Sequence, residues 1–165
     1  ASAASGAVSL IHILGVTPEA STKKKAFHDD RPEEIIEIEM ADLKEVREKY
    51  STNWNKSPKN VAIGCPQLSR QEVIKVLKDL KGKEIVEDIN FWICTNKEIK
   101  DEIINSEYNE IIKSSGAKIT YLCPLLTALP RPLLTNSAKT CFYSYATYKS
   151  MADCIKIATE GINND

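Results

Sequence analysis

Three cysteines are the residues of this 165-residue sequence best suited to chemistry, because each directly follows a short apolar run. They are Cys65, Cys94 and Cys123, and 29 residues separate each from the next. That interval is one strand–helix unit, and the carboxyl ends of parallel strands meet at one edge of a sheet. The three thiols are therefore predicted to lie along a common sheet edge, where thiolates are able to bind iron–sulfur centres or to act as nucleophiles.

Proline follows two of these cysteines, at Cys65-Pro66 and Cys123-Pro124. Proline stiffens the exit from a strand, and Cys-Pro recurs in iron–sulfur ligation. Two alternatives stay open. The sequence has no C-x-x-C pair, so the spacing alone does not indicate a metal site, and each cysteine taken singly is more readily a small buried apolar residue. A thiol-dependent enzyme built on Cys65 or Cys123 is the other alternative, although both histidines lie far upstream.

A second group of polar residues follows the apolar pair Leu133-Leu134 and comprises Thr135, Asn136, Ser137 and Lys139. Hydroxyl and amide groups at a helix start, with a lysine in the first turn, suit a carboxylate or phosphate. The same residue types are also preferred helix N-caps. The pattern alone leaves an anion site and an ordinary cap equally open.

The elements that position these residues alternate between strand and helix. Ser69 and Glu72 fit a capping box, and Gly82 and Gly116 end helical patterns. Strands are predicted at 34–40, 60–64, 89–93, 118–122 and 133–135, and helices at 41–50, 70–81, 99–115 (long or broken) and 151–159. This alternation indicates an α/β fold, a three-layer sandwich with a mostly parallel sheet built from βα units.

Composition excludes several classes of protein. With 22 Lys and Arg against 23 Asp and Glu, the net charge is −1, so binding to nucleic acid has no support. No apolar run has the length of about 18 residues that a membrane span needs. Five cysteines without a leader pattern favour a cytoplasmic protein without a disulfide framework. We expect residues 1–165 to form a single α/β domain, and the abrupt apolar start suggests a fragment of a longer protein.

An ordered set of short motifs resembles the aconitase X family of dehydratases. The resemblance covers about residues 2–145 and implies an aconitase-like fold and the C-terminal portion of the large catalytic part of such an enzyme. Family members remove water from a hydroxyproline or, in archaeal two-subunit enzymes, from mevalonate 5-phosphate in the mevalonate pathway of isoprenoid biosynthesis. The motifs are Ser5-Gly6-Ala7-Val8, Leu14-Gly15-Val16-Thr17-Pro18-Glu19-Ala20, Ile63-Gly64-Cys65-Pro66, Trp92-Ile93-Cys94-Thr95, Cys123-Pro124 and Thr135-Asn136-Ser137-Ala138-Lys139.

The resemblance assigns roles to residues. It implies that Cys65 and Cys123 ligate an iron–sulfur cluster of the 4Fe–4S type, with a third ligand from a part absent here, and that Thr135, Asn136, Ser137 and Lys139 contact a small anionic substrate. Two candidates remain for the catalytic base: Ser137 and a serine of the absent part. The implied partners are a small swivelling subunit or domain and the N-terminal part of the large subunit. Cys94 and the stretch 140–143 depart from the family pattern, and a non-catalytic module that binds an anion or a partner remains the alternative function.

Overall fold

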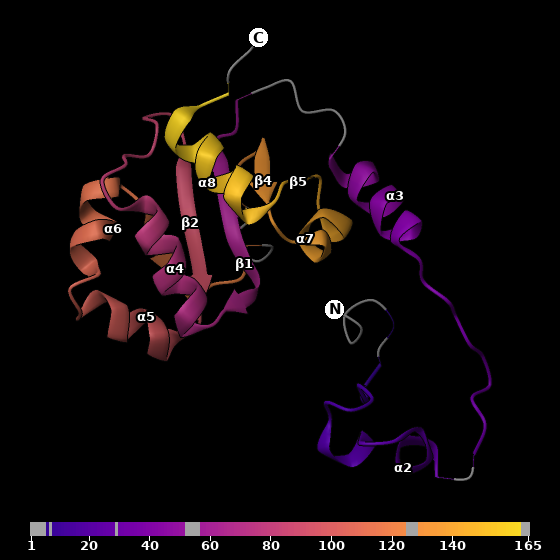
Figure 1. Cartoon of the computed structure of the whole chain (residues 1–165). Coiled ribbons are helices and arrows are strands. Elements are labelled where there is room, and N and C mark those ends of the chain that lie inside the picture. Colours follow the sequence, from indigo (N-terminus) through magenta and orange to yellow (C-terminus); the bar gives the residue numbers. More distant parts are fainter. Residues whose placement is uncertain (1–5, 7, 29, 52–56, 125–128, 163–165) are drawn as a thin grey trace. The chain divides into compact units, whose positions relative to one another are not determined.

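The structure is a computed structural model that describes residues 6, 8–28, 30–51, 57–124 and 129–162. The chain forms two compact units, Ala1–Asp42 and Leu43–Asp165, which are described separately (Figure 1). The sequence suggests a single α/β domain, whereas the structure contains the sheet within the second unit alone. None of the helices among the described residues is long and apolar enough to cross a membrane.

The first unit contains the short helices η1 (Pro18–Ala20) and α2 (Lys23–Phe27). The strand expected at 34–40 is wrong: this segment has no strand partner among the described residues, and Met40 already begins α3 (Met40–Ser51). Alternation of apolar and polar residues produces a half-buried strand only where a neighbouring strand and a core are available. Ile36 and Ile38 are instead 74% and 69% exposed. The helix expected at 41–50 is confirmed by α3.

The second unit is built on a parallel sheet of five strands in the order β3-β2-β1-β4-β5. The chain first extends the sheet on one side of β1 with β2 and β3, and then on the other side with β4 and β5. The sequence analysis misses β5, which is only two residues long. The predicted parallel α/β fold is confirmed by the strands β1 (Asn60–Leu68), β2 (Asn90–Thr95), β3 (Lys118–Thr120), β4 (Leu133–Thr135) and β5 (Thr147–Tyr148).

Helices cover both faces of this sheet. Val61, Ile63, Phe91 and Ile93 face a core formed with α4 (Arg70–Leu80), α5 (Lys97–Ile104), α6 (Asn109–Ser115) and α8 (Met151–Glu160). In Figure 1, α4 and α8 lie in front of the sheet. On the opposite face, Ala62 and Leu133 pack against Cys141 of α7 (Ala138–Tyr143) and Tyr50 of α3. The arrangement is the three-layer sandwich that the sequence predicts.

Local hydrogen bonds set the ends of the helices. The capping box predicted for α4 is present: the Ser69 hydroxyl accepts from Glu72 N–H at 3.4 Å, and Glu72 Oε2 accepts from Ser69 N–H at 2.8 Å. Val73, Val76, Leu77 and Leu80 of this helix are all buried. The predicted broken helix divides into α5 and α6.

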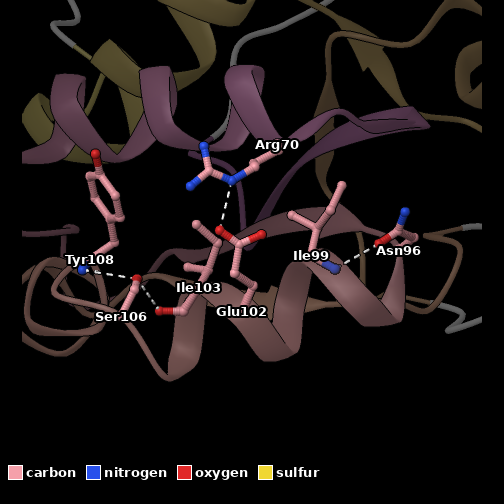
Figure 2. Close-up of polar contacts among 7 residues, drawn as sticks. All are labelled: Arg70, Asn96, Ile99, Glu102, Ile103, Ser106 and Tyr108. Carbon is pink, nitrogen blue, oxygen red and sulfur yellow. Dashed lines mark hydrogen bonds and ion pairs between the residues drawn. The ribbon is translucent and has the colours of Figure 1, made fainter.

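Figure 2 shows how that break is held. Asn96 Oδ1 caps α5 by accepting from Ile99 N–H at 2.8 Å. At the other end, the Ser106 hydroxyl donates to Ile103 O at 2.8 Å and accepts from Tyr108 N–H at 3.3 Å. Arg70 Nε and Glu102 Oε1 form an ion pair of 2.6 Å that joins the start of α4 to α5. These contacts fix α5 and α6 on the same face of the sheet as α4, and α5 begins at the carboxyl end of β2, which belongs to the candidate site.

Candidate functional site

The carboxyl edge of the sheet has a topological switch point between β1 and β4. The chain leaves β1 toward α4 on one face of the sheet and leaves β4 toward α7 on the other face. In open α/β sheets, ligands bind where successive connections diverge in this way. The segments at this switch point are 64–67 and 136–139, which contain most of the candidate residues.

A bulge at the end of β1 contains Cys65. The register pairs Ile63 with Ile93 and then Leu68 with Thr95, so β1 advances five residues while β2 advances two. Gly64 begins the bulge with a φ of 97°, and a Cβ at this position would lie 2.2 Å from the carbonyl oxygen of Cys94. Because only glycine has neither the conformational penalty nor the clash, the residue before Cys65 must be glycine. At the far end of the bulge, the buried Thr95 hydroxyl donates to Leu68 O at 2.6 Å.

The three strand-end thiols lie at one edge of the sheet, as the sequence predicts. Cys94 in β2 is 1% exposed and sits between the strands that lead to Cys65 and Cys123, both of which are half-buried. Burial raises the pKa of the Cys94 thiol to about 12, with smaller contributions from the charges of Cys123 and then Cys65. Cys94 is therefore protonated at neutral pH, and it adjoins a cavity of about 110 Å³ lined by Trp92, Cys94, Thr120, Leu122, Pro124 and Leu129.

The remaining two cysteines lie in the packed layers away from this edge. Burial raises the pKa of Cys141 to about 11 and that of Cys154 to about 12. Cys154 belongs to the core beside α4, and Cys141 belongs to the cluster on the opposite face. Both thiols therefore act as small apolar side chains.

The segment from Thr135 to Lys139 begins α7 and uses two of its hydroxyl groups locally. Thr135 is fully buried, and its Oγ1 accepts from Ser137 N–H at 3.2 Å. Ser137 is 3% exposed, and its Oγ accepts from Thr140 N–H at 3.1 Å, so the cap interpretation is confirmed for this residue. Lys139 is half-buried. The hydroxyl groups of Thr135 and Ser137 thus hold the turn that presents Asn136 and Lys139.

Two side chains link the bulge that contains Cys65 to segments that are distant in the sequence. Asn136 Oδ1 accepts from Gly64 N–H at 3.3 Å, which links the end of β4 to the cysteine bulge at the switch point. Gln67 Nε2 donates to Tyr121 O at 3.1 Å, which links the same bulge to the segment just before Cys123. The sequence analysis misses Gln67, and the only signal for it is its place two residues after Cys65.

The donor set at this edge fits part of an iron–sulfur ligand set. Thiolates are the ligands that such clusters use, and Cys65 and Cys123 are the two half-buried thiols available there. Burial raises the pKa of Cys94 to about 12, so its thiol is protonated at neutral pH when no metal is bound. Within the described part of the chain, no group of three or more His, Cys, Asp or Glu side chains is placed to hold a metal ion. Cys65 and Cys123 alone are too few thiolates for such a cluster.

Comparisons with known proteins agree with this arrangement. Residues 58–160 match the family described as the aconitase X third domain, and residues 1–48 match the aconitase X second domain. The phosphomevalonate dehydratase large subunit of Methanosarcina mazei is 36% identical over 98% of this chain, and that of Methanocaldococcus jannaschii is 32% identical over 91%. The chain spans only 40% and 37% of the length of these two relatives.

A solved structure supports the same relationship. The crystal structure of Thermococcus kodakaraensis aconitase X in its holo-form is similar with a TM-score of 0.62 and 30% sequence identity. The similarity covers 74% of this chain and 34% of that one. The fold, the matched domains and these relatives together show that the chain belongs to the aconitase X family.

Proposed function

We propose that this chain is part of an iron–sulfur-dependent hydro-lyase that eliminates water from mevalonate 5-phosphate. Four archaeal relatives that are 30–36% identical are named phosphomevalonate dehydratase large subunit, and the chain spans 28–40% of their length. The observation that carries the proposal is the hydrogen bond from Gly64 N–H to Asn136, which brings the cysteine bulge and the polar segment together at the switch point between β1 and β4. Remote relatives named cis-3-hydroxy-L-proline dehydratase, 23–24% identical, have the same class of reaction.

In this proposal, Cys65 and Cys123 provide two thiolates for a 4Fe–4S cluster, and a third comes from the part of the large subunit not contained in these residues. When bound, such a cluster supplies a Lewis acid for the departing hydroxyl group. Gly64 and Thr95 hold the two ends of the Cys65 bulge, so that the thiolate is presented from a fixed backbone. Cys94 is not among the ligands that the family resemblance implies, and its buried side chain fills the end of β2.

Lys139 supplies the positive charge for the anionic substrate. Its half-buried position reduces competition from water, and a charged contact is stronger than a neutral one. We assign Ser137 to the α7 cap rather than to proton removal, because its hydroxyl is buried and accepts the Thr140 N–H. The base then belongs to the absent part of the large subunit. A small swivelling subunit completes the enzyme, which acts in the cytoplasm as family resemblance implies.

The proposal is tested on the full-length large subunit combined with its small subunit. Anaerobic reconstitution should produce absorption near 400 nm, stoichiometric iron and sulfide, and water elimination from mevalonate 5-phosphate. Cys65→Ser and Cys123→Ser should each lose the cluster, because a hydroxyl does not replace a soft thiolate. Cys94→Ser, Cys141→Ser and Cys154→Ser are matched controls that should keep it. Full iron content in Cys65→Ser, or loss of iron in Cys94→Ser, would contradict the ligand assignment.

A further inference from the structure

Asn136 makes a contact that a residue dedicated to the substrate would not need. Its side-chain oxygen accepts a hydrogen bond of 3.3 Å from Gly64 N–H, which lies 72 residues earlier in the chain. The regular pairing of β1 with β4 ends at Ala62 and Thr135, so Gly64 lies beyond that ladder. Gly64 is buried, and a buried backbone N–H requires a partner. Asn136 therefore satisfies the Gly64 N–H just beyond the end of the ladder between β1 and β4.

The same contact defines one end of the segment that contains Cys65. The Gly64 backbone lies so close to β2 that an added Cβ would be 2.2 Å from the carbonyl oxygen of Cys94. At Leu68, the carbonyl accepts from the buried Thr95 hydroxyl at 2.6 Å. Cys65 thus lies one residue from the end held by Asn136 and three residues from the end held by Thr95. Loss of the Asn136 oxygen would release the nearer end.

We propose that Asn136 is a positioning residue for Cys65, acting through the Gly64 N–H, and that its side-chain oxygen is not a substrate contact. The inference rests on the proposed function, since it concerns a residue assigned there as a cluster ligand. Residues that orient metal ligands through hydrogen bonds typically change metal affinity or activity by about 10- to 100-fold when they are removed. The proposed role belongs to the side-chain oxygen of Asn136, so it can be tested separately from any role of the amide –NH₂ group.

The experiment compares Asn136→Ala with Asn136→Asp in the full-length large subunit with its small subunit. Alanine removes the acceptor, whereas aspartate keeps a side-chain oxygen in the same place and removes the –NH₂ donor. We expect iron loss to a chelator to be about 10- to 100-fold faster in Asn136→Ala and close to the parent rate in Asn136→Asp. In the metal-free protein, Cys65 should be alkylated faster in Asn136→Ala than in Asn136→Asp, because local opening exposes the thiol.

Asn96→Ala is the matched control. Asn96 also follows a strand-end cysteine and also accepts a backbone N–H through Oδ1, at 2.8 Å, but its partner Ile99 belongs to α5 rather than to a cysteine bulge. This variant should leave iron loss and Cys65 alkylation unchanged. Parental iron retention in Asn136→Ala, or equal iron loss in the aspartate and alanine variants, would overturn the proposal.

Two further outcomes are assigned in advance. If Asn136→Ala does not fold, Asn136→Leu replaces it in the comparison, because leucine is similar in size to asparagine and also lacks the acceptor oxygen. If no variant and not even the parent forms a cluster, the proposed function fails. The alkylation of Cys65 in the metal-free protein then still decides whether Asn136 holds the bulge.

Discussion

Gly64 occupies a position where a single added carbon atom has a large effect. An alanine Cβ would lie 2.2 Å from a main-chain oxygen that cannot rotate away, and the φ of 97° is unfavourable for any L side chain. We expect Gly64→Ala to lower the free energy of unfolding by about 2–4 kcal/mol, the sum of strain and overpacking. Urea unfolding of the two proteins measures the difference.

Gly82→Ala separates the cost of backbone strain from the cost of overpacking. Gly82 also has a positive φ, of 75°, but a Cβ there meets nothing within 4 Å. We expect Gly82→Ala to lower the free energy of unfolding by only about 1–2 kcal/mol, the cost of placing an L side chain at a positive φ. Equal losses in the two variants would show that the approach to the Cys94 carbonyl has no energetic effect.

Lys139 is the residue on which charge recognition of the substrate depends in the proposed enzyme. Lys139→Ala should lower kcat/KM in the full enzyme by about 10- to 150-fold, or about 1.5–3 kcal/mol, with unchanged iron content. Lys139→Arg should recover only part of this loss, because the guanidinium presents a different donor geometry. Kinetics identical to the parent in Lys139→Ala would make Lys139 a surface residue and leave Thr135–Ser137 as a helix cap.

The buried thiol of Cys154 makes stability sensitive to alkaline pH. Burial raises its pKa from the ordinary 9.0 to about 12, so above pH 9 the unfolded chain releases a proton that the folded chain retains. The free energy of unfolding should therefore fall as pH rises from 9 to 11, by up to about 1.4 kcal/mol per pH unit for this thiol. Urea unfolding of the parent and of Cys154→Ala across this range should give a shallower slope for the variant. Parallel slopes would show that burial does not raise the pKa of the Cys154 thiol.

At the scale of elements, the capping box of α4 is a local feature with a measurable contribution. Ser69→Ala removes the hydroxyl that accepts the Glu72 N–H and leaves the helix N-terminus without that partner. The expected loss is about 1 kcal/mol in the free energy of unfolding, measured by urea. Ser69→Thr should restore most of it. A loss below a few tenths of a kcal/mol in Ser69→Ala would show that water replaces the cap.

The elements predicted correctly are those with their own pattern. Val73, Val76, Leu77 and Leu80 mark one face of α4, and the apolar runs that contain Ile63, Ile93 and Leu134 form the strands β1, β2 and β4. The strand predicted at 34–40 is wrong because its alternating apolar residues have no neighbouring strand to pair with. The strand β5 was not predicted because two residues are too few to show a periodic pattern. Local sequence does not contain the information that either case required.

The candidate site was likewise predicted only in part from the sequence. The strand-end placement of Cys65, Cys94 and Cys123 follows from the βα period and was predicted. The contact of Asn136 with Gly64 depends on β4 lying next to β1, which is a property of strand order. The bulge depends on a register change within β1, which no apolar pattern signals. Pairings that are distant in sequence are therefore where the structure adds most.

At the scale of the whole molecule, the proposed enzyme needs more than these 165 residues. It spans 40% of the length of its Methanosarcina mazei relative, and its described residues provide no metal-binding group of three side chains. We expect the purified 165-residue chain to show no water elimination from mevalonate 5-phosphate under anaerobic conditions with iron and sulfide supplied. Adding the remainder of the large subunit and the small subunit should restore turnover. Activity of the isolated chain would refute the assignment of a ligand and of the base to the missing part.

The central place of β1 also has a consequence during synthesis on the ribosome. Asn60 lies opposite Asn90 in β2 and opposite Leu133 in β4, so one edge of β1 gains its neighbour 43 residues later than the other. At translation rates of about 5–20 residues per second, that delay lasts about 2–9 s. During it, a strand with the apolar residues Val61 and Ile63 presents unpaired N–H and C=O groups, which are a template for pairing with other nascent chains. The strand that organises the finished sheet is thus the one most in need of a chaperone while the chain is being made.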